Sequence, residues 1–335
     1  MGDFAPILSV VLPCFNARET VASSIESILG QSFTDFEVLC FDDGSTDGSA
    51  EVVESYAGRD PRIRLLRSEH VGIVEALRRT CSVARGRLIA RMDADDVAHP
   101  ERFSKQISYL ERRPEAGLCG TQVRTVGEEI GTGRERYEAW LNALTTHEEV
   151  VRELFVECPV AHPTLMIRRE VFEAVGGYED RGWAEDYDLL MRCFCAGVRM
   201  GNVSEPLLNW RNGAGRLSLR DDRYSPANFR ALKRHYLLRT YLKDRATFFQ
   251  WGAGEVGKSW LREWDGVRPE AVVDVNPRKI GKVIHGTRVI EASDLPSPGE
   301  GFTVVAVGAP GAREDIRGWF VERGYTETGD FIFLA

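Results

Sequence analysis

Residues 7–47 read ILSVVLPCFNARETVASSIESILGQSFTDFEVLCFDDGSTD and contain two apolar runs of strand length, residues 7–12 and 36–41. Runs with so few polar interruptions are typical of parallel strands that are covered on both faces. Between them, residues 21–29 carry apolar side chains at helical spacing, and Gly30 follows as a helix stop. This strand–helix–strand unit predicts an α/β fold built on a parallel sheet.

The same alternation continues along the chain. Residues 63–66 and 87–92 are further strand-like runs, and a helical pattern across 72–85 separates them. Pro100 can begin the next helix, and residues 117–126 have the pattern of another strand. We therefore expect a mostly parallel sheet, whose ligands bind outside the carboxyl ends of the strands.

Three polar clusters follow directly after predicted strands. They run from Pro13 to Asn16, from Asp42 to Asp47 and from Asp93 to Asp96. Because the carboxyl ends of parallel strands meet at one edge of a sheet, these clusters are expected to line one crevice.

The segment RMDADD, residues 91–96, places three carboxylates within four positions after an apolar strand. In an extended segment Asp93 and Asp95 point the same way, because side chains alternate along a strand. Paired carboxylates on one side of a loop suit a hard cation such as Mg²⁺ or Mn²⁺. The alternative is that they cap the helix near Pro100, but one aspartate suffices for a cap. The pattern favours a metal site.

Other polar residues allow more than one interpretation. Asp43 can accept the N3–H of a uracil ring, although Asp, Gly and Ser are also ordinary turn residues. Glu185 and Asp186 lie at a predicted helix start, where they can take a proton from a hydroxyl or simply interact with the helix dipole. His162 can lie near a metal or phosphate, but a histidine among apolar residues is more often structural. The residues alone leave these alternatives open.

Composition excludes several classes of protein. The net charge of −8 argues against a nucleic-acid-binding protein, which needs a basic face. The seven cysteines are odd in number and lack C-x-x-C spacing, which indicates buried free thiols in a reducing compartment. The opening residues have no basic region typical of a signal peptide, and no apolar run approaches the roughly 20 residues of a membrane span. We expect a cytoplasmic protein without a transmembrane segment.

The length of 335 residues suggests two domains on a prior of about 150 residues per domain. Residues 225–243 have the pattern of an amphipathic helix with basic residues outside its apolar face. We expect a first domain over residues 1–222, a connecting helix over 223–245 and an α/β domain over 246–335. The basic side chains of this helix can either face solvent or contact an anionic membrane surface.

The segments SVVLPCFNARET (9–20), IARMDADD (89–96) and AEDYDLLMR (184–192) resemble the family 2 glycosyltransferases of the GT-A fold. The resemblance extends over about residues 6–220. It implies a nucleotide-diphospho-sugar donor, for which UDP-sugar is the expectation, a divalent Mn²⁺ or Mg²⁺, and inversion at the anomeric carbon. The acceptor it implies is a hydroxyl of a glycan or of a lipid-linked molecule, as in polysaccharide biosynthesis.

Carried over position by position, the resemblance also implies roles for single residues. The residues at the donor are Pro13, Asn16, Asp43, Asp93 and Arg211. The metal ligands are Asp93, Asp95 and Asp96. Asp186 lies where the family has its general base, and His162 and Glu185 lie on the acceptor side. Gly213 is a departure, because many relatives have a histidine there.

The segment FFQWGAGEVGKSW, residues 248–260, places Gly252, Gly254 and Gly257 in a G-x-G-x-x-G pattern. Asp274 follows at about the 20-residue spacing of an acid that binds a ribose. This predicts a small Rossmann-like unit, which resembles the N-terminal domains of some sugar acyltransferases. Two roles are favoured for it: a second site for a sugar nucleotide, or a structural role, including homo-oligomerisation, with an empty glycine turn. NAD chemistry is the least favoured, because no partner catalytic set accompanies the motif.

Two other functions compete with glycosyl transfer. A sugar nucleotidyltransferase should carry a glycine-rich basic loop after its first strand, and PCFNARET (13–20) has a different composition. A non-catalytic sugar-nucleotide-binding protein is expected to lack one of the acidic positions. The sequence has Asp43, Asp93, Asp95 and Asp186, and therefore favours an enzyme.

Overall fold

The computed structural model describes residues 5–127, 130–213, 216–264 and 266–335. Residues 1–4, at the start of the segment examined above for a signal peptide, and residues 214–215, which follow Arg211 and Gly213, lie outside this part of the chain.

The chain divides into two compact units, and each is described by itself. The first comprises Met1–Val150 and Pro159–Asp221, and the second comprises Val151–Cys158 and Asp222–Ala335. The expected domain limits at residues 222 and 245 stay a prediction.

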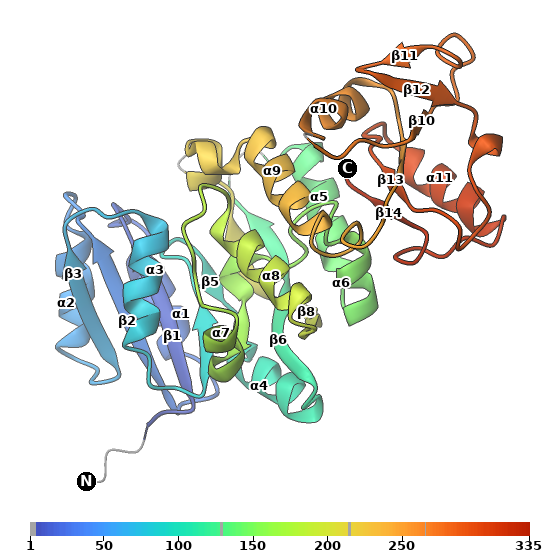
Figure 1. Ribbon diagram of the computed structural model, residues 1–335. Coiled ribbons are helices and arrows are strands. Elements are labelled where there is room, and N and C mark those ends of the chain that lie inside the picture. The colour runs from blue at the N-terminus through green and yellow to red at the C-terminus, as the bar shows by residue number, and fades with distance from the viewer. Residues whose placement is uncertain (1–4, 128–129, 214–215, 265) are drawn as a thin grey trace. The chain divides into compact units, whose positions relative to one another are not determined.

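The first unit is built on an eight-stranded sheet in the order β3-β2-β1-β4-β7-β6-β8-β5 (Figure 1). Strands β1 to β4 are parallel, as are β6 and β8, whereas β7 and β5 run antiparallel to their neighbours. This confirms the predicted mostly parallel GT-A-type sheet. The strands are β1 (Leu8–Cys14), β2 (Phe36–Asp43), β3 (Ile63–Ser68), β4 (Leu88–Arg91), β5 (Val97–Ala98), β6 (Ala116–Val126), β7 (Met166–Arg168) and β8 (Arg199–Arg211).

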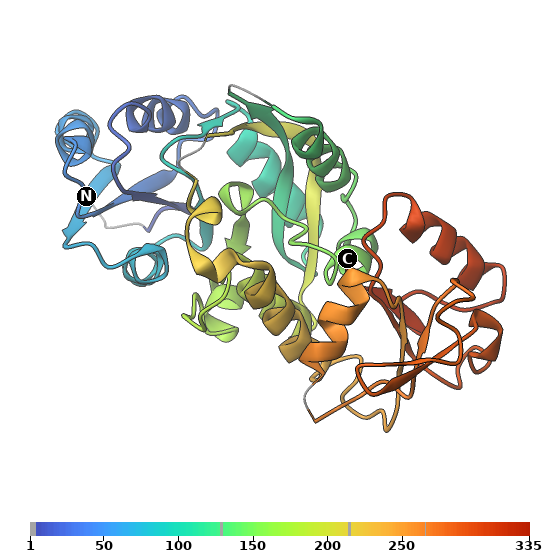
Figure 2. The same ribbon diagram turned by 90° about the horizontal axis from the view of Figure 1, so that it is seen from above.

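Helices cover both faces of this sheet. Figures 1 and 2 show α1 and α2 on one face of β1 to β3 and α3 on the other. All seven residues of β1 are consequently buried, as expected for a strand covered on both sides. The helices are α1 (Val21–Leu29), α2 (Ser49–Ala57), α3 (Ile73–Ser82), α4 (Arg102–Arg112), α5 (Thr132–Asn142), α6 (His147–Glu153), α7 (Arg169–Ala174) and α8 (Glu185–Cys195).

The second unit has a six-stranded sheet in the order β11-β12-β10-β9-β13-β14, parallel except for β11. Without β11, the chain order is the 3-2-1-4-5 of a doubly wound sheet, which confirms the predicted Rossmann-like fold. The likeness to sugar acyltransferase domains stays a prediction. The strands are β9 (Phe249–Trp251), β10 (Ala271–Val273), β11 (Val283–Ile284), β12 (Thr287–Ile290), β13 (Thr303–Val305) and β14 (Phe331–Phe333).

The two faces of β9 pack against different helices. Trp251 belongs to an apolar cluster with Phe320 of α11 (Ala312–Val321). Gln250, the preceding residue, points to the other face, because side chains alternate along a strand. There its side chain accepts a hydrogen bond from the indole of Trp264, just after α10 (Glu255–Glu263), at 2.8 Å.

The helix expected over residues 225–243 is shorter, because α9 spans Pro226–Leu237. Lys233, expected on its polar face, is buried, and its Nζ donates to the carbonyl oxygens of Val156 and Leu334 at 2.6 and 3.1 Å. Burial lowers the pKa of Lys233 to about 8. Helical periodicity placed this residue wrongly, because its partners lie about 80 and 100 positions away in the sequence.

Two expectations from composition can be compared with the structure. All seven cysteines are free thiols and six are buried, as predicted, whereas Cys195 is exposed. Within the described ranges, no helix combines the length and the apolar character needed to cross a membrane.

Candidate active site

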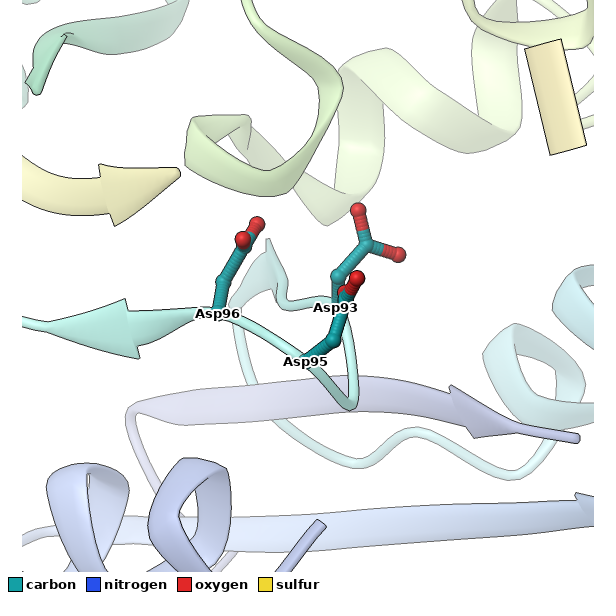
Figure 3. Close-up of side chains that lie close together, drawn as sticks. All are labelled: Asp93, Asp95 and Asp96. Carbon is teal, nitrogen blue, oxygen red and sulfur yellow. The ribbon is translucent and has the colours of Figure 1, made fainter. Parts of the chain in front are cut away.

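Three aspartates converge in the loop after β4 (Figure 3). One carboxylate oxygen from each of Asp93, Asp95 and Asp96 lies within 4.8 Å of the others. The chain turns here, with the N–H of Asp96 donating to the carbonyl of Asp93 at 3.4 Å. The extended segment expected from the sequence is therefore wrong, and the carboxylates meet because the backbone turns.

The aspartates do not cap the helix that follows them. Helix α4 begins at Arg102, its N-cap residue is Glu101, and no side chain makes the cap hydrogen bond. The helix-cap alternative is therefore wrong, and the convergence of the carboxylates needs another explanation.

The electrostatics of this loop favour a cation. Burial, and then repulsion from Asp93, raises the pKa of Asp95 to about 6. Asp96 is fully buried, and burial followed by repulsion from both neighbours raises its pKa well above the usual range. Among the residues the structure describes, Oδ2 of Asp96 has no hydrogen-bond partner. Oxygen ligands that repel one another in this way fit a divalent ion such as Mg²⁺ or Mn²⁺.

A buried arginine that sequence reasoning missed accompanies the aspartates. Arg91, the last residue of β4, is 6% exposed and forms an ion pair with Asp93. Although burial alone would lower it, the pKa of Arg91 is raised by Asp93 and, more weakly, by Tyr178 and Glu185. Arg91 stands two positions before Asp93, and strand alternation was the available signal that both share a side.

Helix α8 begins with Glu185 and Asp186. Glu185 is 2% exposed, and its Oε1 lies 3.7 Å from Nδ1 of His162. Nε2 of His162 lies 2.7 Å from the hydroxyl of Tyr178, and burial lowers the pKa of this histidine well below its usual value. Both predicted acceptor-side residues are thus buried in a polar cluster, and their contact with an acceptor stays a prediction.

Asp186 is half-buried, and its Oδ1 accepts the N–H of Tyr187 at 2.7 Å. Its charge reaches Tyr178, whose pKa is raised well above the usual range first by burial and further by Cys81, Glu185 and Asp186. Arg91 acts on the same tyrosine in the opposite direction. The start of α8 and the aspartate loop therefore surround one cluster.

Asp43 lies at the end of β2 and holds a neighbouring loop. Its two oxygens accept the N–H groups of Val71 and Gly72 at 2.7 and 3.0 Å, and Nδ1 of His70 lies 2.9 Å from Oδ2. Phe15 stacks on His70 with ring centroids 4.3 Å apart. His70 and Phe15 are candidates that the sequence did not single out, and the nucleobase role of Asp43 stays a prediction.

Two other residues predicted to bind the sugar donor lie near the end of β1 or just after it. Pro13 is buried within the strand. Asn16 has a positive φ of 47°, and its Oδ1 accepts the N–H of Thr46 at 2.9 Å. Asn16 thus connects the loop after β1 to the loop after β2. Two of the three polar clusters predicted to lie together are therefore in contact.

Arg211 ends β8 and meets the aspartate loop. Its backbone N–H donates to Oδ1 of Asp96 at 2.7 Å, and its Nε donates to the carbonyl of Asp95 at 3.0 Å. The structure thus brings together Arg211 and the carboxylates, while contact of Arg211 with a diphosphate stays a prediction.

The glycine turn of the second unit is tightly packed. Gly252 has φ 113°, and a Cβ on Gly257 would lie 1.9 Å from the carbonyl oxygen of Gly252. Oδ2 of Asp274 accepts the N–H of Ala253 at 3.0 Å and pairs with Nζ of Lys279 at 2.8 Å. Packing explains Gly252 and Gly257, whereas a Cβ on Gly254 would meet open space. The carboxylate of Asp274 is already bonded to groups of the same unit. A nucleotide role for this turn stays a prediction.

Comparison with known proteins places the chain in a family. Residues 9–176 match the model of glycosyl transferase family 2. The chain is similar to WbnJ of Escherichia coli, an O-antigen biosynthesis glycosyltransferase. The two are 31% identical over 209 residues, which are 61% of this chain and 79% of WbnJ.

Solved structures show the same fold at low identity. TarS 1–349 from S. aureus, in complex with UDP-GlcNAc, matches with a TM-score of 0.57 and 17% identity, over 69% of this chain and 66% of TarS 1–349. The mannosyltransferase PcManGT from Pyrobaculum calidifontis, in complex with GDP-Man and Mn²⁺, matches with a TM-score of 0.51 and 19% identity, over 72% of this chain and 64% of PcManGT. Both matches span slightly less than two thirds of the solved chain.

Proposed function

The chain belongs to glycosyl transferase family 2, and from this we propose that it is an inverting, metal-dependent glycosyltransferase that uses a UDP-sugar. The acceptor is a hydroxyl of a glycan or of a lipid-linked molecule. One observation carries the proposal: three carboxylates converge within 4.8 Å at the carboxyl edge of a parallel sheet, and two of them have raised pKa values.

Asp93, Asp95 and Asp96 are the residues that would hold the divalent ion. When bound, such an ion supplies positive charge to a diphosphate leaving group. The Mn²⁺ in the PcManGT complex supports this choice of metal. Arg91 keeps Asp93 oriented at the end of β4, and Arg211 ties the backbone of the loop to β8.

The uracil preference rests on Asp43. An ionised carboxylate only accepts hydrogen bonds, and the N3–H of uracil is a donor at the corresponding edge of the base. The oxygens of Asp43 accept the N–H groups of Val71 and Gly72, which fixes the carboxylate at the end of β2, and Oδ1 keeps a second lone pair for a further donor. The TarS complex with UDP-GlcNAc supports a UDP-sugar, whereas PcManGT binds GDP-Man.

Asp186 is the proposed general base. It is half-buried at the start of α8, next to the buried cluster of Glu185, His162 and Tyr178 that adjoins Arg91. Its carboxylate accepts the proton of an acceptor hydroxyl while that oxygen attacks the anomeric carbon from the face opposite the diphosphate. A single displacement of this kind inverts the configuration.

A donor panel tests the function directly. The purified protein is incubated with UDP- and GDP-sugars and candidate acceptors, with Mn²⁺ or with EDTA, and released nucleotide diphosphate and the anomeric configuration of the product are measured. We expect UDP release that requires Mn²⁺ and falls in Asp186→Asn. Formation of pyrophosphate from UTP and a sugar phosphate would instead indicate a nucleotidyltransferase, and nucleotide binding without turnover would indicate a binding protein.

A further inference from the structure

Arg134 of α5 is held at the end of β8, where the chain meets the aspartate loop. Its guanidinium lies 3.9 Å from the ring centre of Trp210, and its Nε donates to Oγ1 of Thr125 at 3.2 Å. Thr125 and Trp210 are paired across β6 and β8. Trp210 directly precedes Arg211, whose N–H is bonded to the carboxylate of Asp96. The guanidinium of Arg134 is therefore fixed in place beside this loop.

The charge of Arg134 is only partly compensated. Its side chain is half-buried, and its buried Nη2 has no hydrogen-bond partner among the residues that the structure describes. Burial, followed by the positive charge of Arg216, lowers the pKa of Arg134. Glu138 and Asp96 act in the opposite direction, but neither forms an ion pair with it within the described part of the chain.

Arg216 shows the same deficit. It is half-buried, and its buried Nε also lacks a hydrogen-bond partner within the described ranges. Two guanidinium groups close enough to repel one another, each with a buried and unsatisfied N–H, are unfavourable without an anion. Guanidinium groups bind phosphate oxygens with paired, charge-assisted hydrogen bonds, which satisfy several N–H groups at once.

The charges around the loop indicate which anion fits. Arg91 and a divalent ion together balance the three carboxylates of Asp93, Asp95 and Asp96. A diphosphate diester adds two negative charges, and of the cations already described only Arg211, whose Nε donates to the carbonyl of Asp95, remains to meet them. Arg134 of α5 and Arg216, which follows Arg211 by five positions, supply two further positive charges.

We propose that Arg134 and Arg216 form a binding site for a diphosphate group beside the aspartate loop. The proposal rests on the proposed function for the presence of a diphosphate, and adds the residues that hold it. Two molecules could carry this group: the nucleotide-sugar donor and a lipid-linked acceptor. Both present the same chemistry to the arginines.

Binding of diphosphates to the full chain tests the proposal. Arg134→Met and Arg216→Met are titrated by calorimetry, with Mn²⁺ present and absent, against inorganic pyrophosphate, UDP, uridine and farnesyl diphosphate. Arg136→Met and Arg220→Met are matched controls, because both arginines are exposed neighbours of the proposed pair. Since a hydrogen bond to a charged group contributes about 1.5–3 kcal/mol, each test variant should lose about tenfold or more in pyrophosphate affinity, while the controls lose less than twofold.

The comparison of the four ligands distinguishes the two possible sources of the diphosphate. A loss for UDP with unchanged uridine affinity assigns the site to the donor, and a loss for farnesyl diphosphate alone assigns it to a lipid-linked acceptor. Arg134→Lys should bind pyrophosphate more tightly than Arg134→Met, because it keeps the positive charge. A role of Arg134 only in packing on Trp210 does not predict this difference. Unchanged pyrophosphate, UDP and farnesyl diphosphate affinities in both test variants would overturn the proposal even if sugar transfer is found. Affected binding without any transfer would refute the proposed function instead.

Discussion

The two sheets of this chain share a strand order but differ in what lies at their carboxyl edges. The orders β3-β2-β1-β4 and β12-β10-β9-β13 are both the 3-2-1-4 arrangement, in which ligands bind where the order reverses. In the first unit that edge holds the aspartates after β4, and in the second it holds the glycine turn after β9. The strand order therefore determines where a ligand can bind. The loop residues determine whether polar groups at that edge lack a partner that a ligand would supply.

The difference can be seen in single carboxylates. Asp96 is fully buried and keeps one oxygen without a hydrogen-bond partner in the described part of the chain. Asp274 is also buried, but it accepts N–H groups from Ala253 and Asn276 and pairs with Lys279. The spacing of a nucleotide-binding motif can thus occur together with an acidic residue whose hydrogen bonds are already supplied by the protein itself.

The strongest test compares one acid from each unit. Asp186→Asn should reduce kcat for sugar transfer about 10²–10⁴-fold, because general-base catalysis contributes that much. Asp274→Asn should leave kcat within about twofold, since its partners are internal to the second unit. Steady-state kinetics with the donor found in the panel measure both. A large loss in Asp274→Asn would show that the glycine turn has a role in the reaction.

The second test removes the cation from each edge. Arg91→Met leaves Asp93, which is 29% exposed, without its buried partner beside two other carboxylates, and this should cost on the order of 3 kcal/mol in the free energy of unfolding. Mn²⁺ should restore part of this loss. Lys279 is 29% exposed and Asp274 keeps the N–H groups of Ala253 and Asn276, so Lys279→Met should cost less than Arg91→Met and not respond to Mn²⁺. Denaturant unfolding with and without Mn²⁺ gives the values, and equal costs would contradict the comparison.

The pH dependence of the first unit is the third test. The pKa of Asp95 is about 6, above its usual 3.8, so the folded state binds this proton more tightly than the unfolded state. Stability of the metal-free protein should therefore fall by on the order of 2 kcal/mol as the pH rises from about 4 to about 6. Asp95→Asn should remove the contribution of Asp95 to this fall in thermal melts, while Asp96, whose pKa is also raised well above its usual range, should still contribute to it. The affinity for Mn²⁺ should rise over the same range, which calorimetry can check.

The fourth test concerns the second unit and a different range of pH. The pKa of Lys233 is about 8, below its usual 10.5, so its protonated form is less favourable in the folded state. Stability from this group should increase as the pH rises through 8 toward 10.5. Lys233→Met should remove that increase and leave the acidic range unchanged. A variant that altered the fall between pH 4 and 6 would contradict the assignment of the two ranges to different groups.

Local patterns predicted most of the framework. The helical spacing over residues 21–29, with Gly30 after it, predicted α1, and the structure has this helix at Val21–Leu29 with Gly30 as its C-cap. Positions in sequence also indicated that the three aspartates belong to one loop. They did not indicate the turn that brings the oxygens together, because the backbone conformation of such a loop depends on its neighbours, here Arg211 and Arg91.

Long-range partners account for what the sequence missed. His70 beside Asp43 is 27 positions away, and Arg134 reaches a strand that begins 65 positions later. Lys233 was placed outside the apolar face of its helix, because periodicity describes one helix and not the segments that pack on it.

The sequence by itself determined the alternation of strands and helices, the family, and the acidic edge where a cation is expected, because these depend on residues close together in the chain. Only the tertiary structure decided which charged groups have a partner of opposite charge and which do not. Arg91 neutralises Asp93, Lys279 neutralises Asp274, and Arg134 lies near Arg216, and each result depends on which distant groups share the same low-dielectric space.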